Sequence, residues 1–136
     1  MSDAQNKPAA LDAISVQRLE GVHPDLVKVA YRAAEILGDE FPYRITEGLR
    51  DIKRQRKLVA SGKSQTLKSR HLTGHAVDIV PMLDGEPSFD WPGFYPIADA
   101  FKQASDELGV QIIWGGDWRT FKDGPHFELD RKAYPA

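Results

Sequence analysis

The stretch from Ala76 to Pro81, A-V-D-I-V-P, constrains the fold more than any other part of the chain. Its apolar and β-branched residues are typical of a buried strand, yet a carboxylate, Asp78, stands among them. Alternation along a strand places Asp78 on the same face as Ala76 and turns His75 the other way. We therefore expect a buried strand that presents one carboxylate from one of its faces.

Two histidines can meet this carboxylate. His71 precedes the strand, and Gly74 between them allows the chain to turn and bring the imidazole back over Asp78. The second comes from Lys122 to Leu129, K-D-G-P-H-F-E-L. There a short strand would place His126 on one face together with Glu128, while the apolar residues between and after them face the core.

Two imidazoles and a carboxylate are a ligand set that suits catalytic zinc, which leaves its fourth position to water. We predict that His71, Asp78 and His126 bind Zn²⁺; the chain has no cysteine, so only nitrogen and oxygen ligands are possible. Asp123, before the Gly124-Pro125 turn, could take a proton from water without binding the metal. Glu128 could orient the His126 imidazole. Spacing alone also allows surface or structural roles for these residues.

The pattern Ser69-x-His71-x-x-Gly74-x-Ala76-x-Asp78, followed by Asp123-x-x-His126, resembles the signature of the VanY-like zinc peptidases. These include D-alanyl-D-alanine carboxypeptidases and dipeptidases, and phage L-alanyl-D-glutamate endopeptidases. The resemblance extends to T-E-G-L-R at 46–50, with Gln55 beyond it, and to L-E-G-V-H-P-D-L at 19–26. One position departs from the commoner pattern, because many relatives carry Glu where this chain has the shorter Asp123.

The resemblance implies an α+β fold of the VanY-like, hedgehog-type class: a small, largely antiparallel sheet with packed helices and zinc in a cleft. It implies that Asp123 is the general base and that Arg50 stabilises an oxyanion or binds a substrate carboxylate. By its residues alone, the favoured interpretation of Arg50 is a surface charge in a basic run. Ser69 matches a position that helps to hold substrate, and its alternative role is a hydrogen bond to local backbone.

The same resemblance implies a substrate, the stem peptide of peptidoglycan. Closeness to the phage branch favours an endolysin that cuts between L-alanine and D-glutamate. A D-alanyl-D-alanine carboxypeptidase or dipeptidase is the enzymatic alternative, and a non-catalytic, zinc-stabilised wall-binding domain is the alternative of another class. The carboxylate of Asp123 argues against the latter, because a structural zinc needs no extra, non-ligating carboxylate.

Length and composition fit one soluble domain spanning residues 1–136, with residues 1–11 as a loose arm. A net charge of −2 gives no basic field for nucleic acid. The N-terminus has no signal-peptide pattern, and the chain has no apolar run of membrane-spanning length. We expect a monomer that stays in the host cytoplasm, without membrane insertion, until it is released to the cell wall.

Further patterns place the other elements. We expect a short helix capped by Ser15, helices over 24–37, 51–62 and 95–108, a strand over 43–46 and a central strand over 110–114. Residues 82–93 are predicted to be an extended loop acting as a lid or cleft wall; the spacing of its acidic residues does not fit a calcium loop. The tail after Leu129 is expected to offer no chemistry. Three aromatic residues are candidates for either cleft or core: Trp114, Trp118 and Phe121.

Overall fold

The computed structural model describes residues 11–64, 66 and 68–135. Its α-helices are α2 (Ala13–Arg18), α3 (Pro24–Leu37), α4 (Ile52–Ala60) and α5 (Phe94–Leu108). Its strands are β1 (Tyr43–Glu47), β2 (Ala76–Leu83), β3 (Glu86–Pro87), β4 (Ile112–Trp114) and β5 (His126–Leu129). Three short 3₁₀ helices complete it: η1 (Arg70–Thr73), η2 (Trp91–Gly93) and η3 (Gly115–Asp117). No helix among the described residues is both long and apolar enough to cross a membrane.

The strands form one antiparallel sheet in the order β1-β2-β5-β4, and β3 pairs with the far end of β2. This confirms the predicted α+β class. The prediction of a central strand near residues 110–114 is wrong, because β4 lies at the sheet edge. Strand β2 is central instead, and its register sets Asp78 opposite His126 on β5 and opposite Glu47 on β1.

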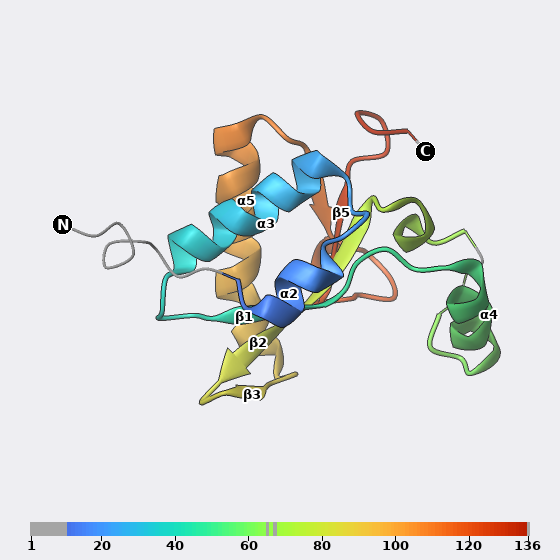
Figure 1. The fold of residues 1–136 in the computed structure, drawn as a ribbon, viewed down its shortest axis with the longest axis horizontal. Coiled ribbons are helices and arrows are strands. Elements are labelled where there is room, and N and C mark those ends of the chain that lie inside the picture. The colour runs from blue at the N-terminus through green and yellow to red at the C-terminus, as the bar shows by residue number, and fades with distance from the viewer. Residues whose placement is uncertain (1–10, 65, 67, 136) are drawn as a thin grey trace.

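Helices α3 and α5 pack together and cover one face of the sheet (Figure 1). Helix α3 begins after His23, which caps it: His23 Nδ1 accepts a hydrogen bond from the Asp25 amide. In the core, Phe101 of α5 stacks on Phe127 of β5 with ring centroids 4.1 Å apart. This stacking holds the Phe127 face of β5 against the core, so the opposite face carries the polar side chains of the strand.

Helix α4 stands apart from the α3/α5 layer, on the right in Figure 1. Asp51 caps it by accepting a hydrogen bond from the Arg54 amide. Its charged residues are exposed, and its single buried residue is Gln55. Burial of apolar side chains therefore contributes little to its attachment.

Three local predictions are wrong. Asp12, rather than Ser15, caps α2, because the buried Ser15 hydroxyl accepts a hydrogen bond from the Ile45 amide instead. Residues 82–93 form the β2–β3 hairpin and η2 rather than an extended loop. Of the predicted N-terminal arm, residues 1–10 lie outside the described chain, whereas Leu11 is buried in the core.

Candidate metal centre

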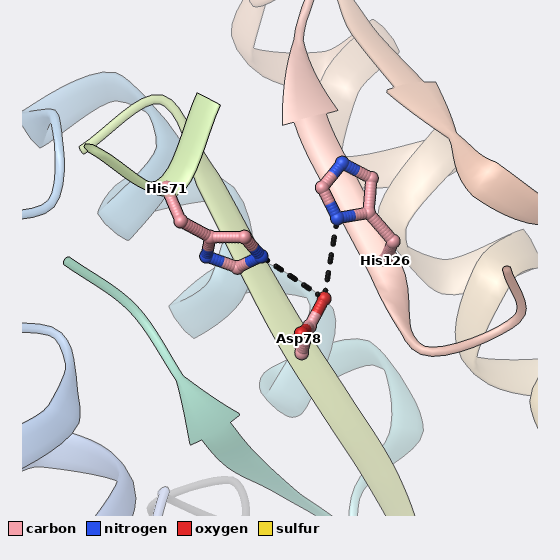
Figure 2. A group of neighbouring side chains, drawn as sticks. All are labelled: His71, Asp78 and His126. Atoms are coloured by element: carbon pink, nitrogen blue, oxygen red, sulfur yellow. Dashed lines mark hydrogen bonds and ion pairs between the residues drawn. The ribbon is translucent and has the colours of Figure 1, made fainter. Parts of the chain in front are cut away.

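His71, Asp78 and His126 come from three different elements and meet at one point (Figure 2). One atom of each lies within 4.8 Å of the others. The same carboxylate oxygen, Oδ1 of Asp78, is 3.2 Å from His71 Nε2 and 3.2 Å from His126 Nδ1. The three predicted metal ligands are therefore brought together.

The backbone around η1 orients His71. Gly74 ends η1 in the left-handed region, at φ 74°, and allows the turn into β2 that the sequence predicted. At the other side of the ring, His71 Nδ1 lies 2.8 Å from the Gly48 carbonyl oxygen. Because a carbonyl only accepts, Nδ1 carries the proton and Nε2 presents its lone pair towards Asp78.

In His126 the two ring nitrogens have the opposite roles: Nδ1 faces Asp78 and Nε2 faces away from it. Its Nε2 lies 2.9 Å from Glu128 Oε1, so Nε2–H donates to this carboxylate and Nδ1 faces Asp78. Residues 126 and 128 share the polar face of β5, as the alternation predicted. Glu128 itself is held by Arg131, whose Nε donates to Oε2 over 3.1 Å. Each imidazole thus has an oxygen partner on the nitrogen that faces away from the centre.

The donor set fits a metal ion. A tetrahedral zinc site with bonds of about 2.0 Å places its ligand atoms about 3.3 Å apart, close to the 3.2 Å separations observed. His71 Nε2 is buried and has no hydrogen-bond partner among the described residues, and such buried atoms are rare without an unrecorded ion or water. An ion between the three side chains would satisfy it.

Asp78 and His126 shift each other's pKa. Burial raises the pKa of Asp78, but the hydrogen bond from His126 and the neighbouring His71 imidazole outweigh it and hold this pKa well below its usual range. Burial lowers the pKa of His126, whereas hydrogen bonds to Asp78 and Glu128 overcome this and raise the pKa to about 9. The metal-free site therefore keeps its carboxylate ionised and holds a proton on His126.

Asp123 lines the same cleft as the three predicted ligands and is outside their group. Burial raises its pKa, and the negative charge of Asp78 raises it further. Its amide donates to the Gly115 carbonyl over 3.0 Å, and a Cβ at Gly115 would collide with the Asp123 backbone. Gly115 is thus needed for the approach of the two loops that positions this carboxylate.

Arg50 follows β1 and reaches the site from the other side. Its Nη2 lies 3.7 Å from Asp78 Oδ2, and its Nε and Nη2 donate to Glu47 over 2.9 and 2.6 Å. Its Nη1 donates to Gln55 over 2.6 Å. The side chain is buried, which contradicts the surface alternative.

The site opens into a cleft of about 760 Å³. Trp118 and Phe121 line it, whereas Trp114 is buried in the core. Ser69 also lines it, and its hydroxyl accepts a hydrogen bond from the His71 amide, so the local role is realised at a position open to substrate. No residue of the 82–93 segment is in the lining, so the predicted lid or wall is wrong.

Some residues of the site were missed by sequence reasoning. Glu47 is the bidentate partner of Arg50, and its place three residues earlier is the one signal that could have revealed it. The buried Arg70 donates to the carbonyls of Leu129 and Tyr134, and Arg131 holds Glu128. The tail after Leu129 therefore supports the site, contrary to the prediction that it offers no chemistry.

Comparison with known proteins places this geometry in a family. Residues 9–135 match the family model described as phage L-alanyl-D-glutamate peptidase. The chain belongs to this family. The VanY-like resemblance inferred from the motifs is thereby confirmed.

Individual relatives carry names that agree with the description of the family model. The chain is 35% identical over 126 residues to the L-alanyl-D-glutamate peptidase of Escherichia phage T5, covering 88% of each chain. It is 34% identical to the peptidoglycan L-alanyl-D-glutamate endopeptidase CwlK of Bacillus subtilis, over 62% of this chain and 59% of that one. The crystal structure of the Serratia marcescens L-Ala D-Glu endopeptidase ChiX superposes with a TM-score of 0.87 at 47% identity, covering 99% of this chain and all of that one.

Proposed function

We propose that this protein is a zinc-dependent peptidoglycan endopeptidase that hydrolyses the bond between L-alanine and D-glutamate in the stem peptide. The observation that carries the proposal is the convergence of His71, Asp78 and His126 in an open cleft, in a chain of the L-alanyl-D-glutamate peptidase family. His71 would bind zinc through Nε2, His126 through Nδ1, and Asp78 through its carboxylate.

Bound zinc would supply Lewis acidity, which makes water nucleophilic near neutral pH and polarises the scissile carbonyl. Asp123 would take the proton of the attacking water and later pass it to the leaving amine. Its raised pKa makes the carboxylate a better proton acceptor and brings the group nearer the operating pH, where one residue can serve first as base and then as acid. Arg50 would stabilise the negative charge that develops on the carbonyl oxygen. Ser69 would hold the peptide beside these groups.

The biological setting follows from the same proposal. The protein would be a monomeric lytic enzyme of the phage type, without a nucleic-acid partner. It would be made in the host cytoplasm and would reach peptidoglycan after another protein opens the membrane.

The products released from purified peptidoglycan test the activity. Mass spectrometry should find peptides with a new N-terminal D-glutamate. Release of D-alanine alone would instead indicate a carboxypeptidase, and binding to the wall with zinc present but no cleavage would leave a wall-binding domain.

Elemental analysis tests the ligands. The purified protein should carry about one zinc per chain, and His71→Ala and His126→Ala should lose metal and activity together. Full zinc content in both variants would refute the ligand assignment.

A further inference from the structure

Gln55 is a fully buried polar side chain that the proposed chemistry does not use. It is the single buried residue of α4, a helix whose other side chains are wholly or partly exposed. A buried amide is costly unless its donors and acceptor are satisfied, so its hydrogen bonds show what it is placed to do.

The two ends of the amide face different structures. Its Oε1 accepts from Arg50 Nη1 over 2.6 Å. Its Nε2 donates to the Ser64 hydroxyl over 2.8 Å and to the Thr66 carbonyl. The partners decide which end of the amide is Oε1 and which is Nε2, because a guanidinium only donates and a carbonyl only accepts.

Ser64 and Thr66 belong to a stretch after α4 that lines the cleft. We name this stretch the α4 wall and define it by its described lining residues: Lys63, Ser64, Thr66, Lys68 and Ser69. The wall ends at Ser69, which caps η1, the element that carries His71. One amide thus bridges the guanidinium beside the metal centre and the middle of the substrate-facing wall.

The Arg50 guanidinium needs this third contact. Glu47 holds its Nε and Nη2, but Glu47 is also engaged by the exposed Arg54, whose Nε donates to Oε1 over 2.8 Å. Gln55 is the contact that fixes Nη1, the remaining corner of the fork. A planar fork held at both ends presents its free N–H groups in one direction, which oxyanion stabilisation requires.

We propose that Gln55 is a positioning residue that sets the Arg50 guanidinium for catalysis and ties the α4 wall to it, so that the wall and the charge that meets the reacting carbonyl move as one unit. The proposal rests on the proposed function, because it takes Arg50 as the oxyanion group. It assigns Gln55 no contact with substrate or metal.

Three variants separate the two halves of this role. Gln55→Met keeps the volume and loses every hydrogen bond. Gln55→Glu keeps an acceptor for Arg50 and loses the donor to the wall. Ser64→Ala alters the wall alone, and Gln103→Met, at an exposed position of α5 outside the cleft, is the matched control.

Hydrolysis of purified peptidoglycan measures the first half. Gln55→Met should lower kcat on the order of tenfold or more, because a misplaced oxyanion group loses most of its effect. Gln55→Glu should have a kcat clearly above that of Gln55→Met, and Ser64→Ala should raise KM more than it lowers kcat. Zinc content should equal that of the unmodified protein throughout. A wild-type kcat in Gln55→Met, or no advantage of Gln55→Glu over it, overturns the positioning of Arg50.

Limited proteolysis measures the second half without using activity. Trypsin should cut after Lys63 and Lys68 several-fold faster in Gln55→Met, Gln55→Glu and Ser64→Ala than in Gln103→Met. Equal rates overturn the attachment of the wall. If the unmodified protein cleaves no peptidoglycan, the proposed function fails, whereas the trypsin comparison still decides whether Gln55 holds the wall.

Discussion

Zinc binding should release a proton, because the metal-free site holds one where a ligand lone pair is needed. The pKa of His126 is raised to about 9, so at pH 7 this imidazole is almost fully protonated. Zinc binds the neutral imidazole and must displace the proton. The two pH units between 7 and about 9 weaken the apparent affinity about a hundredfold, equivalent to about 2.7 kcal/mol. From pH 7 to 8 the affinity should therefore rise about tenfold, and its dependence on the His126 proton should end above pH 9.

Isothermal titration of the metal-free protein with zinc measures this directly. Repeating the titration at pH 7 in weakly chelating buffers of different ionisation enthalpy gives the number of protons released, which should be at least about one per zinc. Glu128→Gln provides an internal check. Removal of its charge lowers the pKa of His126, so the zinc affinity should stop rising with pH at a lower pH than in the unmodified protein. Release of fewer than half a proton at pH 7, with an affinity independent of pH, would refute the assignment of the proton to His126.

Substitutions at four positions test separate parts of the structure. Asp123→Ala should keep zinc and still sediment with peptidoglycan but lose on the order of a hundredfold or more in rate, whereas Asp123→Glu should keep some activity; a wild-type rate in Asp123→Ala would exclude it as the base. His75→Ala should keep zinc and most activity, because this ring bonds Thr73 and lies outside the metal group; loss of metal would contradict the register of β2. Glu128→Gln should weaken zinc affinity roughly tenfold to a hundredfold by removing a charged partner of a ligand, measured by competition with a chelator above pH 9, where the His126 proton no longer competes, with Glu107→Gln as the control. Phe127→Ala should lower the free energy of unfolding by about 3–5 kcal/mol, and a loss below 1 kcal/mol in urea denaturation would contradict its place in the core.

The residues that were predicted correctly are those whose side-chain orientation is set by their neighbours in the sequence. Alternation along β5 is enough to predict that His126 and Glu128 lie on the face opposite Phe127. Gly74 indicates the turn that brings His71 back to Asp78. Local patterns of this kind follow from the periodicity of a strand and from the freedom of glycine.

The failures involve contacts between distant segments. A three-residue strand does not reveal whether it lies at the centre or the edge of a sheet, so the place of β4 could not be predicted. Arg70 is buried because it donates to the carbonyls of Leu129 and Tyr134, 59 and 64 positions further along the chain, which its place in a basic loop does not indicate. Ser15 is a competent helix cap by residue type, but its hydroxyl is taken by the Ile45 amide, 30 positions further along the chain.

The sparse attachment of α4 has a consequence for how such enzymes diversify. Among its described residues, the segment from Ile52 to Ser69 contributes one side chain, Gln55, to the buried interior before it reaches η1, yet it supplies one side of the cleft. Insertions, deletions or exchanges in it would leave the layer of α3 and α5 intact, provided that the amide and its partners persist. Evolution, or an engineer, can therefore treat this segment as a replaceable cassette that adapts a constant hydrolytic centre to cell walls of different chemistry.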